Sequence, residues 1–258
     1  MSKKLIVGNW KMHFTTGQAS LYLHKLQEQA PSYRDVEVVL CPNLLALQSL
    51  SLQVNHRKFR LGAQNCYFED AGAFTGEVSA TQMRGLVSYV IVGHSERRHI
   101  FGETNKLVAN KVQAVLRNGM KPILCVGETK HERSEGETAH VIHDQVVAGL
   151  RNISSDEIEN VVIAYEPVWA IGTGDFAKVE DAEKVGKLIR KHVRALFGDK
   201  AAETVRVLYG GSVDASNAGA FMRGEGIDGL LVGGSSLKAK VFGSIIDSAH
   251  GLETAKDN

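Results

Sequence analysis

Cysteine, proline and net charge are all scarce in this chain of 258 residues. There are four prolines, and the three cysteines, Cys41, Cys66 and Cys125, are widely spaced and form no CxxC pair. An odd number of scattered cysteines builds no disulfide framework, so a reducing compartment is the simplest setting. The sequence also has no Pro- or Ser-rich stretch that would serve as a linker, which favours a single domain over residues 1–258.

Charge and hydrophobicity exclude several classes of protein. The 30 lysine and arginine residues are balanced by 29 aspartate and glutamate residues, so a net charge of +1 gives no field that would attract nucleic acid or an anionic membrane. No apolar run approaches the roughly 18 residues of a membrane helix, and the apolar stretch near the N-terminus is too short for a secretory signal. With 43% hydrophobic residues the composition is that of a folded globular protein, which we expect in the cytoplasm.

Short apolar runs recur along the whole chain. They are rich in Val, Ile and Leu, lack strict alternation, and cover residues 5–7, 36–40, 59–63, 87–92, 122–126, 161–165, 205–209 and 229–232. Runs of this kind are typical of parallel strands that are covered on both faces. Their starts are about 32 residues apart on average, which is the length of a strand and a helix in a βα unit.

Segments with helical periodicity lie between these runs, at 18–30, 105–118, 137–151, 178–197, 214–223 and 237–249. Asn118-Gly119 and Gly198 provide stop signals, and Asp214 provides a cap. Eight strand and helix units without a linker predict an α/β protein, a single (β/α)8 barrel of parallel strands. An open doubly wound sheet is the alternative, but it usually has fewer strands, and the units show no division into two halves.

Polar residues follow the apolar runs. In a (β/α)8 barrel the C-terminal ends of the strands meet at one mouth, where catalytic groups are found. The groups that would share this mouth are Asn9, Lys11, Gln64, Asn65, His94, Glu128, Glu166 and the glycine-rich turns at 210–212 and 233–234. A lysine, a histidine, a carboxylate and two glycine turns together indicate proton transfer on a phosphorylated substrate.

Glu166 and His94 are the candidates for acid and base chemistry. Glu166 ends a buried run, so we expect burial to raise its pKa towards the range of a general base, although a strand-end glutamate can also simply form an ion pair. His94 precedes the segment 95–98, where the positive end of a helix dipole would keep the imidazole neutral. A structural role is the alternative for this histidine. Lys11 ends an apolar run and offers a fixed cation for enolate charge or phosphate.

The two glycine turns follow the last two predicted strands, where this fold commonly binds phosphate with loop amides. Ser212 would add a hydroxyl donor there, and Ser235 and Ser236 would cap the following helix. Either turn alone could be no more than a tight turn. Two such turns at adjacent strand ends favour a phosphate site.

Four segments, taken together, resemble one known family. They are GNWKM at 8–12, GHSERR at 93–98, AYEPVWAIGTG at 164–174 and YGGSV at 209–213. These segments are similar to those of the triosephosphate isomerases, and the resemblance runs on through Gly233-Gly234 to Leu237-Lys238. It implies the interconversion of dihydroxyacetone phosphate and D-glyceraldehyde 3-phosphate through an enediolate, in glycolysis and gluconeogenesis, with no cofactor and no metal.

The resemblance also implies roles for individual residues. Glu166 would carry a proton from one carbon to the next, while His94 would polarise and protonate the oxygens. Asn9 and Lys11 would complete the electrostatic site and contact the substrate, with Glu96 in support. Backbone amides would bind the phosphate, and they belong to Gly172, Ser212, Gly233 and Gly234.

A lid is implied as well, because an enediolate next to a phosphate group can expel that group and a closed lid would suppress this path. Ile171 from the lid and Leu231 from the last strand would press apolar surface around Glu166, and Tyr209 would bind the closed lid near Ala177. The lid residues are Pro167, Val168, Trp169, Ala170, Ile171, Gly172, Thr173 and Gly174.

The far end of this lid departs from the family pattern. Asp175-Phe176-Ala177-Lys178 stands where the family commonly has a lysine followed by small or β-branched residues. A charge is inverted and an aromatic ring is introduced. We expect altered opening kinetics with the chemistry intact.

Residues 64–77 resemble the interface loop of the family. By that resemblance the chain is a homodimer in which Thr75 approaches Asn9 and Lys11 of the partner. A solvent-exposed loop is the alternative.

Four other interpretations are weaker. Residues 172–177 fit the dinucleotide pattern GxGxxA, but no apolar strand directly precedes them. His140 and His143 lie on one predicted helix without a third convergent ligand, so we expect an exposed face rather than a zinc site. A sugar-phosphate aldolase on the same barrel would need a buried lysine, whereas the sixth predicted strand ends in Glu166. A catalytically silent relative that keeps only the fold is the last alternative.

Overall fold

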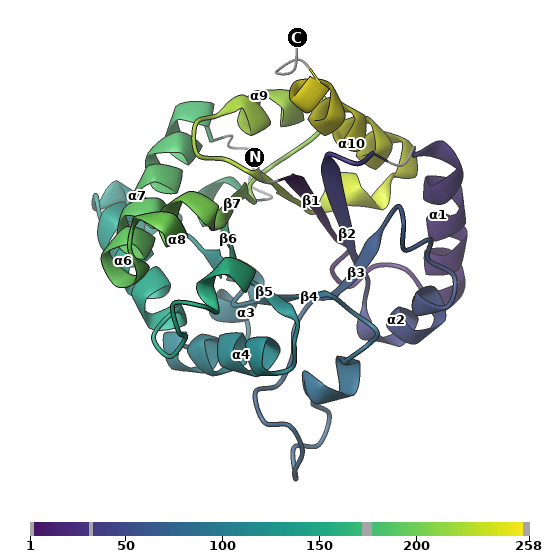
Figure 1. The fold of residues 1–258 in the computed structure, drawn as a ribbon, viewed down its shortest axis with the longest axis horizontal. Helices are drawn as coiled ribbons and strands as arrows, with labels where there is room; N and C mark the ends of the chain where they lie inside the picture. Colours follow the sequence, from purple (N-terminus) through teal and green to yellow (C-terminus); the bar gives the residue numbers. More distant parts are fainter. Residues whose placement is uncertain (1–2, 31–32, 172–176, 255–258) are drawn as a thin grey trace.

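The strands form a closed parallel barrel. The computed structural model describes residues 3–30, 33–171 and 177–254. Its strands pair in chain order, and the last pairs with the first, Leu5 lying opposite Gly229 (Figure 1). They are β1 (Lys4–Asn9), β2 (Val36–Cys41), β3 (Arg60–Ala63), β4 (Tyr89–Val92), β5 (Lys121–Val126), β6 (Val162–Tyr165), β7 (Arg206–Tyr209) and β8 (Gly229–Val232). Each overlaps one of the apolar runs, so the predicted (β/α)8 barrel is confirmed.

Helices surround this barrel as an outer ring (Figure 1). They are α1 (Thr16–Gln29), α2 (Leu44–Ser51), α3 (Ser95–His99), α4 (Asn105–Arg117), α5 (Lys130–Ser134), α6 (Thr138–Gly149), α7 (Val179–Phe197), α8 (Asp199–Thr204), α9 (Ala218–Arg223) and α10 (Ala239–Thr254). The six predicted helices are present as α1, α4, α6, α7, α9 and α10. The four that were not predicted are short, with at most eight residues each, so they show little helical periodicity.

Local signals set several helix ends. The Thr104 hydroxyl accepts the amide of Leu107 at the start of α4, and Gly119 beyond its end has a φ of 74°. The helix expected from residue 214 begins only at Ala218, because the Asp214 carboxylate accepts the amides of Ser216 and Asn217 and so caps a turn that precedes it.

Side chains of the strands divide between two cores, because successive residues point to opposite faces. Those that face outward pack against the helices in the larger core. Those that face inward form a cluster made of strand residues, with Leu5, Val7, Val39, Cys41, Tyr89, Ile91, Ile123, Cys125, Val162, Ala164, Leu208 and Leu231 as its members. The interior is therefore filled, and chemistry is confined to the barrel ends.

The N-terminal end of the barrel is closed by polar contacts. Arg206 donates to Glu37 (2.7 Å) and to the Tyr89 hydroxyl (2.7 Å), which in turn donates to Glu37 (2.9 Å).

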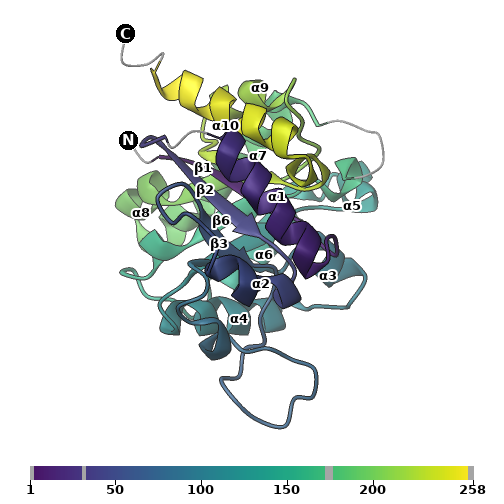
Figure 2. The same cartoon turned by 90° about the vertical axis from the view of Figure 1, so that its right-hand side faces the viewer.

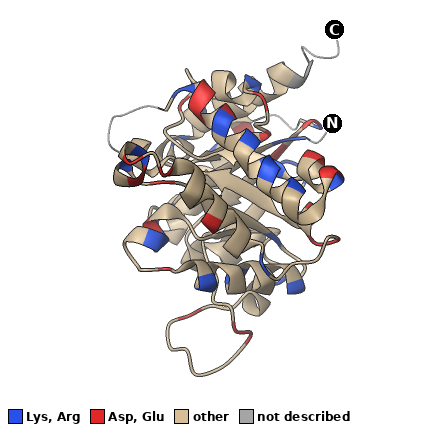
Figure 3. Cartoon of the chain, turned by 90° about the vertical axis from the view of Figure 1, so that its left-hand side faces the viewer, with Lys and Arg blue, Asp and Glu red and all other residues tan. Residues whose placement is uncertain are grey.

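At the other end, the connection between β3 and β4 projects away from the barrel (Figure 2). Lys and Arg are interspersed with Asp and Glu on the side drawn in Figure 3. No helix in the described ranges is long and apolar enough to cross a membrane.

Candidate active site

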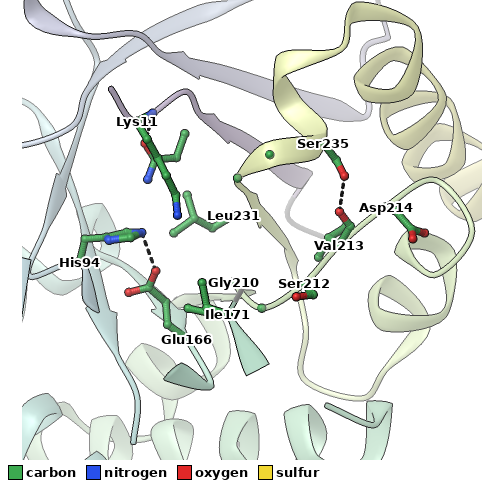
Figure 4. Close-up of a pocket in the computed structure, with 14 residues that line it drawn as sticks. Lys11, His94, Glu166, Ile171, Gly210, Ser212, Val213, Asp214, Leu231 and Ser235 are labelled. Carbon is green, nitrogen blue, oxygen red and sulfur yellow. Dashed lines mark hydrogen bonds and ion pairs between the residues drawn. The ribbon is translucent and has the colours of Figure 1, made fainter. Parts of the chain in front are cut away.

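A cavity of about 360 Å³ lies at the C-terminal ends of the strands (Figure 4). The predicted site residues that line it are Asn9, Lys11, His94, Glu166, Ile171, Ser212, Leu231, Gly233 and Gly234. Gly210, Gly211, Val213, Asp214 and Ser235 complete the lining. Residues that are up to 226 positions apart in the sequence thus meet at one mouth, as the strand ends predicted. Five residues named in the predictions, Gly172, Thr173, Gly174, Asp175 and Phe176, lie outside the described ranges.

Glu166 and His94 face each other across this cavity (Figure 4). Only 2% of Glu166 and 6% of His94 is exposed, and Oε1 of the carboxylate lies 2.8 Å from Nε2 of the imidazole. The other carboxylate oxygen, Oε2, accepts the backbone N–H of Ser95 at 2.9 Å. Ser95 was not predicted to take part, because a backbone donor leaves no residue-specific signal in the sequence.

The other nitrogen of His94 is held by the start of α3. Nδ1 accepts the backbone N–H of Glu96 at 3.2 Å, and His94 is itself the N-cap of that helix. A nitrogen that accepts an N–H carries no hydrogen of its own. The arrangement therefore favours a ring whose single hydrogen sits on Nε2 and points to Glu166, which is the form that can donate to a substrate oxygen.

The predicted pKa directions for these two residues are wrong. Burial alone raises the pKa of Glu166, but the charge and hydrogen bond of His94, followed by the Ser95 amide and Lys11, outweigh it and leave the pKa below its usual value. Burial alone lowers the pKa of His94, and the charge and hydrogen bond of Glu166 more than offset it. Both shifts depend on the 2.8 Å contact between the two side chains.

Lys11 stands beside this pair on a tightly held turn. Its backbone φ of 51° lies in the left-handed region, which few residues other than glycine adopt. The turn is fixed because the Lys11 amide donates to Asn9 Oδ1 (3.1 Å) and Gln64 Nε2 donates to the Lys11 carbonyl (2.8 Å). The ammonium group lies 2.5 Å from Glu96 Oε1. Gln64 was recognised only as a strand-end residue.

The two glycine turns lie side by side at the cavity wall. The Ser235 hydroxyl donates to the carbonyl of Val213 (2.6 Å) and so joins one turn to the other (Figure 4). The Ser236 hydroxyl donates to the carbonyl of Gly233 (2.7 Å). The prediction that these serines cap α10 is wrong, because both lie in a 3₁₀ turn, Gly234–Leu237, that precedes it. The Ser212 hydroxyl donates to the carbonyl of Ala170 (2.8 Å).

The described part of the predicted lid is anchored to Glu128, whose exposed fraction is 0%. Its Oε1 accepts the indole N–H of Trp169 (2.9 Å) and the hydroxyl of Tyr165 (3.1 Å). Arg133 stacks on the Trp169 ring, with 4.1 Å from its guanidinium carbon to the ring centroid, and donates to Asp181 (3.1 Å) in the first turn of α7. Arg133 therefore links Trp169 of the predicted lid to the first turn of α7, the helix that follows it.

Two glycines make room for Glu166. A Cβ atom on Gly127 would lie 1.7 Å from the carbonyl oxygen of Glu166, and one on Gly210 would lie 3.1 Å from its Cγ. Neither residue can carry a side chain without displacing the carboxylate or its backbone. In the sequence, each of these glycines could be noticed only as a glycine that directly follows an apolar run.

The remaining predicted residues lie outside the cavity. Tyr209 is fully buried and stacks on Phe221, with 3.8 Å between ring centroids, and its hydroxyl has no hydrogen-bond partner among the described residues. Thr75 is exposed in the β3–β4 connection. Within the described ranges, no three His, Cys, Asp or Glu side chains come together as a metal site.

Comparison with known proteins identifies the family. A family model described as triosephosphate isomerase matches residues 4–249. The chain belongs to the triosephosphate isomerase family. It is 46% identical to the triosephosphate isomerase of Alkaliphilus metalliredigens over 248 residues, which cover 96% of this chain and 100% of that protein. It is 45% identical to the enzyme of Clostridium tetani (96% and 97% covered) and 42% identical to that of Dictyoglomus turgidum (96% and 100% covered).

Membership of the triosephosphate isomerase family confirms the resemblance that was inferred from the four sequence segments. The dinucleotide and aldolase interpretations have no counterpart in these matches. The four segments lie at the C-terminal ends of β1, β4, β6 and β7.

Proposed function

We propose that this chain interconverts D-glyceraldehyde 3-phosphate and dihydroxyacetone phosphate in glycolysis and gluconeogenesis, with Glu166 as the base that moves the proton. The observation that carries the proposal is the buried pair of Glu166 and His94 at the cavity mouth, 2.8 Å apart, with Lys11 beside it. A base, a hydrogen-bond donor and a cation are the three groups that an enediolate needs.

The proposed reaction needs no oxidant and no cofactor, because only protons change position within the substrate, one from carbon to carbon and one from oxygen to oxygen. The Glu166 carboxylate takes a proton from the carbon next to the carbonyl, a carbon–carbon double bond forms, and the carbonyl oxygen becomes negative. The Nε2–H of His94 and the ammonium group of Lys11 stabilise that oxygen, with Asn9 holding the turn of Lys11. His94 gives its Nε2 proton to that oxygen and takes the hydroxyl proton from the oxygen of the neighbouring carbon, which becomes the new carbonyl. Protonated Glu166 returns its proton to the carbon that first carried the carbonyl group.

The substrate itself would make Glu166 a stronger base. In the resting site the carboxylate has a lowered pKa because His94, Ser95 and Lys11 stabilise its charge. A substrate placed between Glu166 and His94 would break the 2.8 Å contact and leave burial as the dominant influence. Ile171 and Leu231, which line the same cavity, would exclude water as the lid closes over it.

The phosphate group would be bound by the amides of Ser212, Gly233 and Gly234, together with Gly172 from the lid. Support comes from the position of Lys11, since a Cβ atom on Gly233 would lie only 3.5 Å from the lysine Cε. The same cation would therefore serve both the phosphate and the enediolate oxygen. Residues 167–174 would form the lid, and Tyr209 would hold it near Ala177 once it is closed.

We also propose that two copies form a homodimer through the β3–β4 connection. A second cavity of about 360 Å³ opens beside the first and shares Asn9, Lys11 and His94 with it. Its rim carries exposed apolar side chains, with Met12 96% and Phe101 67% exposed. The projecting loop of a partner, with Thr75 at the contact, would fill this cavity and support Lys11. We place the enzyme in the cytoplasm as a single-domain protein.

The test is steady-state turnover of D-glyceraldehyde 3-phosphate in metal-free buffer, with a Glu166→Gln variant prepared identically. Loss of the base should lower kcat by several decades, each tenfold step corresponding to about 1.4 kcal/mol. Glu28→Gln is the matched control, because Glu28 is an exposed residue of α1 that pairs with His24. A folded wild-type protein without turnover would leave a silent relative, and carbonyl trapping with borohydride would reveal an aldolase.

A further inference from the structure

Two histidines meet in the outer ring, away from the active-site cavity. His143 belongs to α6 and His192 to α7, and these helices pack against each other (Figure 1). The two Nδ1 atoms are 3.4 Å apart, with the rings inclined at 66°. The sequence associated His143 with His140, but His140 turns to Asp144 instead (3.4 Å).

The separation of the two nitrogens matches a metal ion. Zinc binds imidazole nitrogen at about 2.0–2.1 Å in tetrahedral geometry, which places two ligand nitrogens about 3.4 Å apart. Imidazole is a ligand that suits zinc, copper and nickel, whereas magnesium and calcium prefer oxygen. The pair is therefore already spaced as two neighbouring ligands of one such ion.

The surroundings keep a lone pair available. A metal ligand must be neutral imidazole, whose ring nitrogen without a hydrogen offers a lone pair. Nε2 of His192 is buried without a hydrogen-bond partner in the described ranges, so Nδ1 is the nitrogen through which this ring meets another group. His143 is exposed, so an ion can enter from solvent.

We propose that His143 and His192 bind one divalent transition-metal ion of the zinc class through their Nδ1 atoms, with water as the remaining ligands. No third His, Cys, Asp or Glu among the described residues joins the pair, so binding is weaker than at a closed four-ligand site. A bound ion would fasten α6 to α7, the helix that begins beyond the predicted lid.

The experiment measures Zn²⁺ binding to the purified full-length protein at pH 7.5 by equilibrium dialysis in a non-coordinating buffer. Wild type should bind one equivalent that His143→Ala or His192→Ala weakens at least tenfold. His140→Ala is the matched control, since it removes an exposed histidine from the same helix, and it should retain that equivalent. Mg²⁺ should not compete. With Cu²⁺ in place of Zn²⁺, electron paramagnetic resonance should show two imidazole nitrogens in wild type and one in either variant.

His143→Ala decides the matter even if His192→Ala fails to fold, because His143 is exposed. Wild-type Zn²⁺ affinity in a folded His143→Ala protein would overturn the proposal, as would the absence of any bound equivalent in wild type. Loss of the equivalent in His140→Ala would overturn it as well, since the ion would then be bound along α6 alone.

Discussion

Substitution of Gly127 by alanine should displace Glu166, the proposed base, while leaving its carboxylate chemically unchanged. The new Cβ would lie 1.7 Å from the carbonyl oxygen of Glu166 and 2.6 Å from its carbonyl carbon. A carbon and an oxygen that are not bonded approach to about 3.3 Å, so the Glu166 backbone must move by about 1.5 Å. The obstructing atom is backbone, which cannot swing aside as a side chain would.

The size of the effect follows from that displacement. A misplacement of about 1 Å in a reacting group can cost about a hundredfold in rate, so Gly127→Ala should lower kcat at least that much, and overpacking should cost about 1–3 kcal/mol of stability. Gly210→Ala, whose Cβ would lie 3.1 Å from the Glu166 Cγ, requires a shift of a few tenths of an ångström and should cost less than tenfold. Gly243→Ala meets no atom within 4 Å and should keep kcat unchanged.

Steady-state kinetics of the three variants, with urea unfolding of each, provide the measurement. The expected order of kcat is Gly243→Ala, then Gly210→Ala, then Gly127→Ala. Gly243→Ala should also gain up to about 1 kcal/mol of stability, because alanine favours the α10 helix. A folded Gly127→Ala enzyme with wild-type kcat would refute the view that this packing positions Glu166.

Three further predictions concern the dimer, the barrel floor and the lid. Thr75→Asp should give monomers with reduced activity in sedimentation velocity and turnover, while Ser155→Asp, an exposed loop change elsewhere, should not; a fully active Thr75→Asp dimer would argue against the proposed interface. Burial alone raises the pKa of Glu37, but Arg206 outweighs it and holds the pKa below its usual value. Folding therefore favours the charged Glu37 carboxylate. Its contribution to the free energy of unfolding is present at neutral pH and is lost as pH falls through the folded-state pKa. In urea unfolding, Glu37→Gln should cost about 2 kcal/mol at pH 7 and progressively less below about pH 4, and a constant difference would contradict this. Replacing Asp175-Phe176 by Lys-Thr should change the lid relaxation seen in temperature-jump fluorescence of Trp169, and unchanged relaxation and turnover would remove the proposed role of these residues.

Much of the fold could be predicted because its strands are buried on both faces. A strand such as β6 then appears as a continuous apolar run, and a long helix such as α7 shows its period over 19 residues. The short helices α3 and α5 could not be predicted in this way. They depend on single caps, such as the Thr129 hydroxyl that accepts the amide of Glu132.

The sequence predicted which residues line the cavity, but not the directions in which the pKa values of Glu166 and His94 are shifted. Strand ends place Lys11, His94 and Glu166 at one mouth in any barrel of this register. The pKa directions of His94 and Glu166 depend on a contact of 2.8 Å between two side chains that follow different strands, which no local pattern encodes. For the same reason the sequence associated His143 with a neighbour on its own helix rather than with His192 on the next.

Closure of the barrel between its first and last strands has a consequence for biosynthesis. Lys11 follows β1 and Gly233 follows β8. One wall of the active site can therefore form only after nearly the whole chain has left the ribosome. Until β8 arrives, the nascent protein carries two unpaired strand edges, on β1 and β7, of the kind that recruit other chains into aggregates. Any truncation before β8 should therefore yield an inactive product that aggregates. The C-terminal portion is needed both to pair the open strand edges and to complete the active-site wall.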